Sequence, residues 1–343
     1  MNQNKKKATV YTVAEQAGVS IATVSRTLAG SRKVSPDTRQ RVMQAVEDLD
    51  FEPNPSARRL AYKKTETLAL VFPDISGPFY STVIRGVEQQ AGRHGHNVLI
   101  YGTHGKEGSG RYLRTLSSKV DGLIIMARSV DEDSLLSLER QDVPFVLLGH
   151  SNGQLQCSTI AVDNELGAYK AASHLLGHGH QRIGIITGPE NSPDNKGRLQ
   201  GYKKALLDAG ISLQQNMVVP GNFRYEEGQI AIQRLLEGNS PPTAVLAAND
   251  EMAMGAMDAA QHRNLRVPED LAVIGFDDIQ MSALIRPSLT TVRQPMQLLG
   301  EAAVTLLFDR LQSSNGQPRH EMLDTELVIR QSCGCLIPSN SKT

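Results

Sequence analysis

The feature that most constrains this fold is a series of short, uninterrupted apolar runs that begins at residue 67 and alternates with helical segments. Strands that are apolar at nearly every position are typical of parallel sheets whose two faces are both covered by helices. The runs lie at 68–72, 98–101, 122–126, 145–148, 159–162, 183–186, 244–247 and 272–276. They predict an α/β body of two doubly wound parallel-sheet lobes, with a ligand site outside the carboxyl ends of the strands.

The first 50 residues follow a different, all-α pattern. Short helices are predicted over 13–17, 21–28 and 36–49. The hydroxyl residues that can cap them are Thr12, with Glu15 as its capping-box partner, Ser20 and Ser35. Gly18 and Gly30 are expected to end the first two helices, because glycine adopts positive φ at little cost. Two short helices joined by a tight glycine-containing turn, with a third for support, predict a helix-turn-helix head.

Charge separates the same two regions. The whole chain has 36 basic and 36 acidic residues, so its formal net charge is zero. Residues 1–64 hold 12 basic and six acidic side chains, which gives this head a charge of +6 and leaves −6 on the rest. A small basic head on a larger acidic body indicates an arm that binds nucleic acid.

The second helix of a helix-turn-helix enters the major groove of DNA. Val24 and Leu28 are four residues apart and are expected to face the core of the head. Arg26 is expected to face outward, where its guanidinium can bind a guanine edge. The other residues expected to contact DNA, at bases or phosphates, are Thr12, Ser20, Ile21, Ala22, Thr23, Ser25, Lys33, Ser35 and Thr38. A three-helix domain that binds protein is the alternative interpretation.

Motifs spread along the chain resemble one known family. They lie at 9–26, 51–61, 178–184, 249–256, 266–270, 273–278 and 289–292. Together they resemble the LacI/GalR family of bacterial transcription repressors, and the similarity covers nearly the whole chain. The resemblance implies a homodimer that binds near-palindromic, double-stranded operator DNA, one head on each half-site.

The resemblance also implies a hinge over 53–64. In the family, the hinge helices of the two protomers pair in the minor groove at the operator centre. Asn54, Ala57 and Leu60 are the hinge residues expected to contact DNA, with Leu60 wedged into the central base step. Ordinary packing of Leu60 against the body is the alternative.

The expected domain boundaries follow from the same resemblance, since the body is similar to periplasmic sugar-binding proteins whose lobes close around a ligand. They are 1–52 for the head, 53–64 for the hinge, 65–335 for the body (lobe 1 about 65–161 and 294–323, lobe 2 about 162–293 and 324–335) and 336–343 for a tail. The tail carries no apolar heptads, so a dimer is expected rather than a tetramer.

Candidate effector contacts follow predicted strands or lie in adjoining turns. They are Phe79, Tyr80, Arg128, His150, Asp194, Arg198, Phe223, Asn249 and Asp277. Arg198 is expected near the start of a helix, where its guanidinium can bind adjacent hydroxyls or a carboxylate. Each main candidate has a structural alternative: core packing for Phe79 and Tyr80, an ion pair for Arg198, and helix capping for Asn249 and Asp277.

These observations predict a sequence-specific DNA-binding regulator, a repressor of a carbohydrate-utilisation operon controlled by a small-molecule effector. The amide, carboxylate and guanidinium candidates suit sugar hydroxyls. Ser192 occupies a loop position where the purine-binding member of the family has an arginine, which disfavours purines. The alternatives are a DNA-binding regulator controlled by a protein corepressor, as in catabolite-control members, and a sugar-binding module or enzyme without a DNA role.

No catalytic motif and no cofactor motif occurs in the sequence, so an enzyme is not expected. Cys157, Cys333 and Cys335 are expected to be free thiols in a reducing, cytoplasmic setting, with the protein on the nucleoid when it binds DNA. His174 and His178 have the i, i+4 spacing of metal ligands, but no acidic or cysteine partner follows nearby, so no metal is expected. No signal peptide is expected, and no apolar stretch of the sequence is long enough to span a bilayer.

Overall fold

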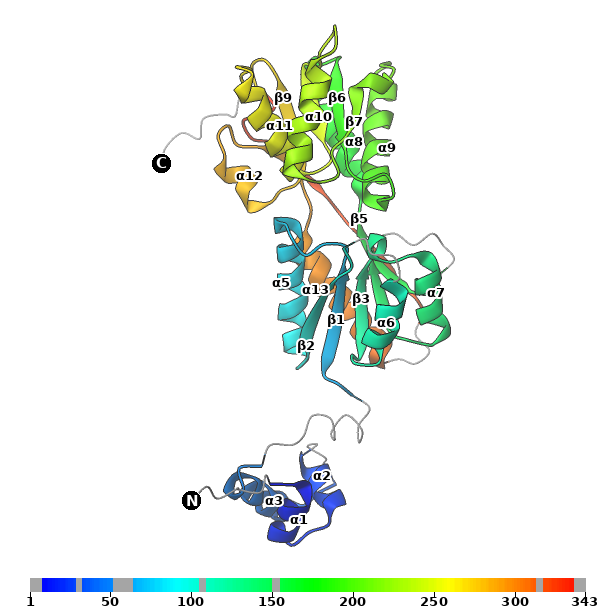
Figure 1. Cartoon of the computed structure of the whole chain (residues 1–343), viewed down its shortest axis with the longest axis vertical. Helices are drawn as coiled ribbons and strands as arrows, with labels where there is room; N and C mark the ends of the chain where they lie inside the picture. Colours follow the sequence, from blue (N-terminus) through cyan, green and yellow to red (C-terminus); the bar gives the residue numbers. More distant parts are fainter. Residues whose placement is uncertain are drawn as a thin grey trace. The chain divides into compact units, whose positions relative to one another are not determined.

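The computed structural model describes residues 8–28, 33–51, 64–104, 109–149, 155–312 and 317–335. The chain divides into two compact units, residues 1–65 and 66–343 (Figure 1). The first unit is the head and the second is the body, and each is described by itself below.

Three helices form the described part of the head: α1 (Val10–Ala17), α2 (Ile21–Leu28) and α3 (Pro36–Asp48). The first begins three residues earlier than predicted. Thr9, not Thr12, is its N-cap, and Thr12 is the third helical residue, whose hydroxyl completes the capping box from the other side. The prediction treated Thr12 as the cap because a capping box with glutamate at its third position is the commoner pattern, but hydroxyls at both ends serve equally.

The remaining signals in the head behave as predicted. Gly18 ends α1 with φ of 63°. Ser20 accepts a hydrogen bond from the Thr23 backbone N–H at 3.2 Å, and Ser35 is the N-cap of α3 with Pro36 at its first position. Gly30 lies outside the described residues. The buried core consists of Val13, Ala14, Ala17, Val24, Val42 and Ala45, and Leu28 packs against it.

Lobe 1 of the body is built on a six-stranded parallel sheet. Its strands are β1 (Thr67–Phe72), β2 (Asn97–Gly102), β3 (Gly122–Met126), β4 (Phe145–Leu148), β5 (Ser158–Val162) and β11 (His320–Leu323), in the order β11-β5-β4-β3-β1-β2. Its helices are α5 (Pro78–Arg93), α6 (Ser109–Ser117), α7 (Glu132–Arg140) and α13 (Met296–Gln312). Alternate residues of β1 enter two separate cores: Leu68 and Leu70 pack with α5 and α13, whereas Ala69 and Val71 pack with α6 and α7.

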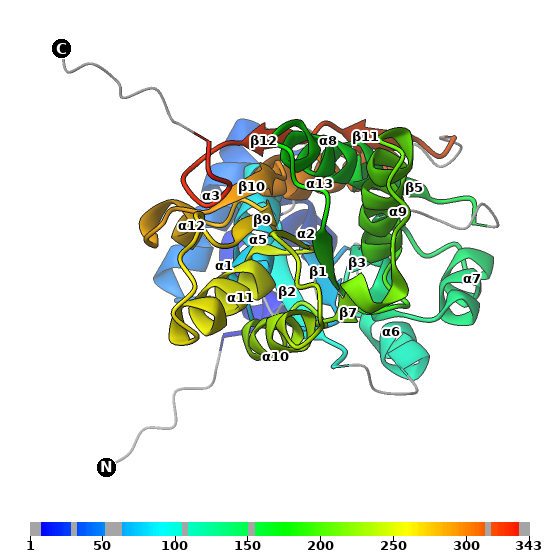
Figure 2. The same ribbon diagram turned by 90° about the horizontal axis from the view of Figure 1, so that it is seen from above.

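Lobe 2 repeats this plan. Its strands are β6 (Ile183–Thr187), β7 (Val218–Pro220), β8 (Ala244–Ala247), β9 (Ala272–Asp277), β10 (Thr290–Arg293) and β12 (Glu326–Val328), in the order β12-β10-β9-β8-β6-β7. Only β12 runs antiparallel among the described pairings of this sheet. The helices are α8 (Asn164–Gly177) and α9 (Pro193–Asp208) on one face, α10 (Tyr225–Leu236) and α11 (Asp250–His262) on the other, and the short α12 (Gln280–Leu284) (Figure 2).

The fold class is therefore confirmed, and all eight apolar runs are strands. Four further strands, β7, β10, β11 and β12, were not predicted. Three of them are short edge strands, and β7 ends in a proline. The fourth, β10, begins with two threonines that interrupt the apolar pattern but are buried with hydrogen-bonded hydroxyls.

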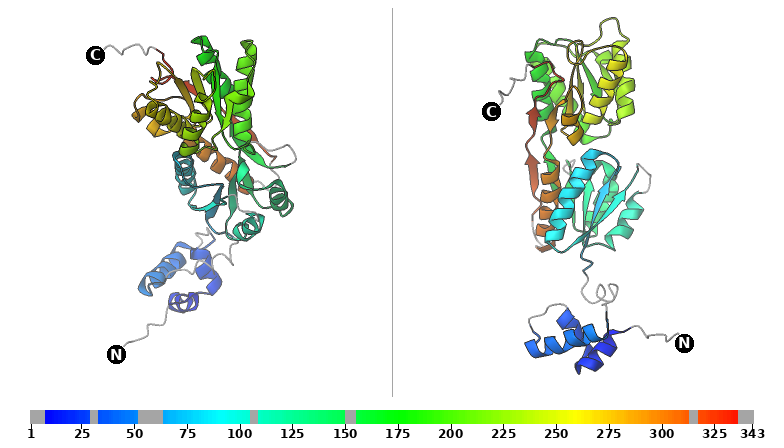
Figure 3. Two further views of the ribbon diagram at one scale, coloured as in Figure 1. Left: turned by 45° about the horizontal axis from the view of Figure 1, so that its top comes forward. Right: turned by 90° about the vertical axis from the view of Figure 1, so that its left-hand side faces the viewer.

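Three connections link the two lobes (Figure 3). The chain passes from β5 to α8, from β10 to α13, and from β11 to β12. A one-turn helix at Ala127–Ser129 follows β3, and a second at Gln215–Met217 precedes β7. No helix of the described residues is long and apolar enough to cross a membrane.

Close helix pairs in the body depend on glycine. At the α10–α11 contact, a Cβ at Gly255 would overlap the Tyr225 carbonyl oxygen, and one at Gly228 would overlap backbone atoms of Met252. Backbone atoms cannot move aside as a flexible side chain can. The two helices therefore approach each other only because these positions carry no side chain.

Gly255→Ala is expected to lower the free energy of unfolding by about 1–3 kcal/mol, the usual cost of overpacking a close contact. Gly238→Ala is the matched control, because a Cβ there meets nothing within 4 Å. Urea or thermal denaturation followed by circular dichroism measures both changes. Equal stability of the two variants would show that the α10–α11 contact yields easily.

Candidate functional site

A polar cleft of the described body lies between the lobes, at the carboxyl ends of the strands. It holds about 610 Å³ of space, part of which is open to solvent. Its lining comes from lobe 1 at Asp74, Ser76, Phe79, Tyr80, Met126 and Arg128, and from lobe 2 at Asp194, Arg198, Asn222, Phe223, Arg224, Asn249, Glu251 and Asp277. A cleft of this size is typical of small-molecule sites.

A buried ion pair stands on the lobe 2 side of the cleft. Arg198 and Asp277 are 4% and 5% exposed, and 3.6 Å separates Nη1 of Arg198 from Oδ1 of Asp277. Burial raises the pKa of the Asp277 carboxyl well above its ordinary value, and the positive charge of Arg198 opposes that shift. Gln294 donates a hydrogen bond to the same carboxylate oxygen at 2.5 Å.

Other contacts fix the orientation of Arg198. Its Nε donates to Oδ1 of Asn164 at 2.8 Å, and its Nη1 donates to the Ala248 carbonyl. The guanidinium carbon lies 3.9 Å from the centre of the Phe276 ring. The helix that carries Arg198, α9, begins at Pro193 and is capped by Ser192, so Arg198 stands in its second turn, later than predicted.

Two consecutive residues at the start of α11 have different roles. Asn249 is the N-cap and accepts a hydrogen bond from the Met252 backbone N–H, while its Nδ2 donates to the Phe223 carbonyl. Asp250 is fully buried and lies outside the cleft lining. Its carboxylate accepts hydrogen bonds from the Ile279 N–H and from the hydroxyls of Ser282 and Thr291, and burial raises its pKa.

Aromatic rings and a second arginine form the lobe 1 wall. Phe79 and Tyr80 make an edge-to-face contact with ring centres 5.4 Å apart. Arg128 donates a hydrogen bond to the Tyr80 hydroxyl at 2.7 Å, and its guanidinium carbon lies 5.7 Å from the Phe223 ring of lobe 2. Burial raises the pKa of Tyr80, so its hydroxyl is protonated at neutral pH.

A polar contact crosses the mouth of the cleft. Arg224 of lobe 2 forms an ion pair with Asp74 of lobe 1 and donates a hydrogen bond to Ser76 Oγ at 3.1 Å. The sequence reasoning missed these residues, as it missed Met126, Asn222 and Glu251. Proximity to a predicted strand end was a usable signal for Asp74 and Glu251, but the pairing of Asp74 with Arg224 joins positions 150 residues apart and has no local signature.

Eight of the nine predicted effector contacts line this one cleft, and the ninth, His150, lies outside the described residues. The structural alternatives predicted for these candidate effector contacts are confirmed for some of the residues and not for others. Asn249 does cap a helix and Arg198 does form an ion pair, yet both also line the cleft. Asp277 is no such cap, because α12 begins after Ile279 and receives no side-chain hydrogen bond. Phe79 and Tyr80 pack partly against the lobe 1 core.

Three residues that line the cleft have positive φ, and one of them is Asn222 at 52°, a region that asparagine tolerates well. Asp277 has φ of 129° and Phe223 has φ of 63°. Non-glycine residues adopt positive φ rarely, and such strain persists where the surrounding structure holds it in place. The hydrogen bonds to the Asp277 side chain and to the Phe223 carbonyl supply that restraint.

The head presents a separate candidate surface. Ile21, Ala22 and Arg26 are exposed on α2, whereas Val24 is fully buried beneath them. The other predicted contacts are exposed or half-buried: Thr12, Ser20, Thr23, Ser25, Lys33, Ser35 and Thr38. Tyr11 is 68% exposed and was not predicted, although a tyrosine hydroxyl is a common phosphate donor. Asn54, Ala57, Leu60 and the rest of the hinge lie outside the described residues.

A helix-turn-helix head joined to a two-lobed body with a ligand-sized cleft defines a class: DNA-binding regulators with a ligand-binding body. Family comparison agrees for both parts. Residues 9–54 match the model of bacterial regulatory proteins of the lacI family, and residues 172–333 match the periplasmic binding protein-like domain. The chain belongs to the lacI family of bacterial regulatory proteins and is a DNA-binding transcription regulator.

Relatives of known role match over nearly their whole length. The HTH-type transcriptional repressor CytR of Escherichia coli (strain K12) is 38% identical over 331 residues, which is 96% of this chain and 97% of that protein. Catabolite control protein A of Priestia megaterium is 36% identical over 327 residues, 94% and 98% respectively. These relatives are transcription regulators, not enzymes.

Solved structures show the same architecture. The lac repressor dimer bound to operator and the anti-inducer ONPF has a TM-score of 0.84 at 31% identity, and covers 96% of this chain and 99% of that one. The regulator CelR in complex with cellobiose has a TM-score of 0.73 at 34% identity, with 95% and 99% covered. A LacI family regulator from Enterococcus faecium with bound ribose has a TM-score of 0.72 at 32% identity, with 79% and 100% covered.

Asp250→Asn is expected to destabilise the body by roughly 1–3 kcal/mol, because one of the three donors around its carboxylate would face an amide N–H₂. Asp277→Asn should cost less. One side-chain donor contacts Asp277, and Arg198 keeps its bonds to Asn164 and Ala248. Urea denaturation measures the free energy of unfolding of both variants. Equal decreases would show that Asp277, like Asp250, mainly stabilises the fold.

Proposed function

We propose that this regulator is a repressor whose affinity for its operator changes when a sugar binds in the cleft between the lobes. The observation that supports this most directly is the Arg198–Asp277 pair, with Asn249 beside it in the same cleft lining. Guanidinium, carboxylate and amide groups donate to and accept from neighbouring hydroxyls in pairs. The repressed genes are then those of carbohydrate utilisation.

The charges and rings of the cleft fit a neutral, ring-shaped ligand. Three arginines and four carboxylates line it: Arg128, Arg198, Arg224, Asp74, Asp194, Glu251 and Asp277. This near-balance does not favour a phosphorylated ligand, which needs an excess of positive charge. Phe79 and Phe223 supply apolar faces for a sugar ring. The cellobiose and ribose complexes of the two structural relatives support a sugar in this position.

A lobe movement is the proposed route from ligand to DNA. The contacts across the mouth, Arg224 with Asp74 and Arg128 with Phe223, are partly exposed polar contacts. Exposed ion pairs contribute only about 0–1 kcal/mol, so the contacts across the mouth oppose a lobe movement only weakly. A ligand that touches both walls can therefore shift their relative position, and couplings of this kind are typically about 1–3 kcal/mol.

The proposal includes a homodimer, with one head on each half of a near-palindromic operator in the cytoplasm. Exposed apolar side chains occur on two elements on the left-hand side of the body in Figure 1: Leu99 and Ile100 on β2, and Met281 and Leu284 on α12. They are between 43% and 60% exposed. Apolar side chains on one side of a monomer are typical of a subunit interface. The head, hinge and body boundaries are proposed at residues 52 and 64.

A sugar that fits the cleft is expected to raise the melting temperature, because a ligand at 100 times its dissociation constant adds about 2.7 kcal/mol of stability. Ribose, cellobiose, sugar phosphates, nucleosides and purines form the panel for a thermal-shift screen. Isothermal titration of the hit should show at least tenfold weaker binding to Asp277→Asn. Asp270→Asn is the control, since Asp270 forms an ion pair with Arg266 away from the cleft lining.

The hit is then added to a complex of the protein with operator DNA, where the proposal expects a change in affinity. A rise in melting temperature that only purines produce would contradict the sugar assignment. If no compound of the panel changes the melting temperature, and DNA binding responds instead to a protein fraction of a cell extract, the protein-corepressor alternative is favoured.

Arg26→Ala is expected to weaken specific DNA binding by about 1–3 kcal/mol and to relax preference at one base position, because Arg26 is proposed to bind a guanine edge. Lys33→Ala, a proposed phosphate contact, should weaken binding to all sequences alike. Fluorescence anisotropy against an operator selected from random DNA, and against its single-base variants, separates the two. Uniform weakening by Arg26→Ala would exclude base recognition by this residue.

A further inference from the structure

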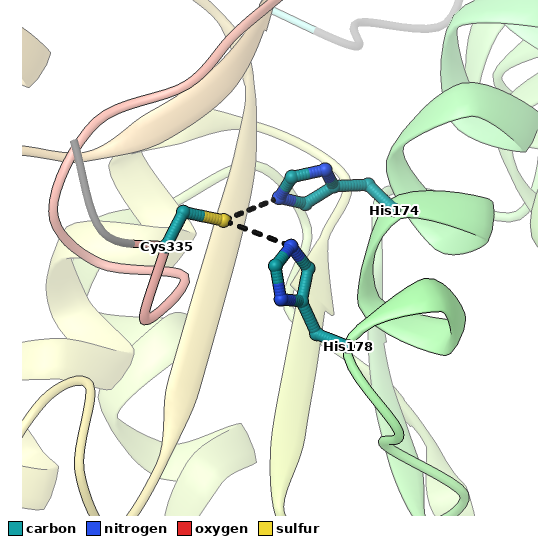
Figure 4. Close-up of side chains that lie close together, drawn as sticks. All are labelled: His174, His178 and Cys335. Carbon is teal, nitrogen blue, oxygen red and sulfur yellow. Dashed lines mark hydrogen bonds between the residues drawn. The ribbon is translucent and has the colours of Figure 1, made fainter. Parts of the chain in front are cut away.

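The end of α8 and the C-terminal segment of the body bring three metal-ligand side chains together in lobe 2. Figure 4 shows the Cys335 sulfur between the imidazole rings of His174 and His178. Its Sγ lies 3.0 Å from Nε2 of His174 and 3.1 Å from Nε2 of His178. All three ligand atoms lie within 4.8 Å of one another. We propose that these side chains bind a zinc ion.

The two histidines are already arranged as a chelating pair. They are four residues apart at the C-terminal end of α8, so their rings extend from the same face of the helix, with centroids 4.7 Å apart. Both present Nε2 to the same sulfur. Two rings directed at one point from a rigid helix lose little conformational freedom when they bind a metal.

The ligand type and spacing fit zinc. Imidazole nitrogen and thiolate sulfur are its usual ligands, at about 2.0 and 2.3 Å. Tetrahedral coordination at those lengths separates nitrogen from sulfur by about 3.5 Å. The observed 3.0 and 3.1 Å separations therefore need to open by a few tenths of an ångström. The two ring nitrogens, which are up to 4.8 Å apart, need to close to about 3.3 Å. A mixed sulfur–nitrogen set selects zinc over magnesium or calcium, which prefer oxygen.

Cys333 supplies a further donor beside this cluster. Its Sγ lies 3.0 Å from that of Cys335, and the Thr290 hydroxyl donates to it at 3.2 Å. Cys333 is 1% exposed, whereas His178 is exposed, so the site has a buried side and a side open to an entering ion. A second sulfur, as the fourth ligand, suits the closed tetrahedral sets of structural zinc sites.

The site would act as a clamp within lobe 2. Cys335 is separated from His174 by 161 residues, and a bound ion would fasten the C-terminal segment to α8. None of the cluster's residues lines the cleft. Zinc is therefore expected to stabilise the folded body by mass action, without being part of effector recognition.

The full-length chain, purified without a polyhistidine tag and kept reduced, tests this. Metal analysis after zinc loading and desalting should find one zinc per chain. Co²⁺ titration should produce the thiolate-to-cobalt charge-transfer absorption of a cysteine-ligated site. Zinc should also raise the melting temperature of the chain.

Variants in the same short segment supply the matched comparison. His178→Gln and Cys335→Ser should each weaken zinc binding at least tenfold. The double variant Cys333→Ser with Cys335→Ser should abolish the charge-transfer band, because both sulfurs are then absent. His180→Gln is the control, because His180 is only two residues from His178 but bonds to Thr243. A reduced wild-type chain that retains no zinc would overturn the proposal. Equal loss of zinc in His180→Gln, or charge-transfer absorption that survives when Cys333 and Cys335 are both serine, would do the same.

Discussion

A parallel strand that is buried on both faces can place polar side chains only at its ends, and the chemistry of this body depends on that constraint. The interiors of β6, β8 and β9 are fully buried and almost wholly apolar. Polar groups appear where these strands stop, at Asn249 and Asp277. Because the strands are parallel, those ends meet at one edge of the sheet, and the opposite lobe places its own strand ends against them. The cleft is a consequence of how both sheets are covered.

We propose that the Arg198–Asp277 pair serves ligand recognition more than stability. A buried ion pair gains about as much from its charges as it loses in desolvation, so replacing such a pair with apolar residues is often neutral or stabilising. Asp250 shows the contrast one strand away. Its carboxylate has three buried donors from three positions and thereby fixes the start of α11 against β10 and the segment after β9. Asp277 has one side-chain donor and a strained backbone, as expected of a group held ready for a ligand.

Sequence reasoning reached the fold class and most of the cleft because both depend on local signals. Apolar runs locate central strands, and polar residues that follow them locate strand ends. Sequence reasoning failed where no single local pattern of residues identifies the element. The edge strands β11 and β12 carry polar residues, because each has one neighbouring strand and its side chains are exposed or half-buried. The cap of α1 was placed at Thr12 because Glu15 completes the commoner capping-box pattern, whereas the backbone places the cap at Thr9.

The His174–His178–Cys335 cluster is a further case that local sequence patterns could not identify, because its members are far apart in the sequence. Local spacing identified the two histidines and then argued against a metal, because no cysteine followed them within ligand distance along the chain. The third side chain of the cluster, Cys335, comes from the C-terminal segment of the body, where the chain after β12 returns past α8. Pairing at such separation is set by sheet topology: β12 lies beside β10, so the residues that follow it must pass the end of α8. A metal bound here would stabilise the last part of the fold. Among the described residues, β12 is the one strand of lobe 2 that the chain supplies after it has left that lobe for lobe 1.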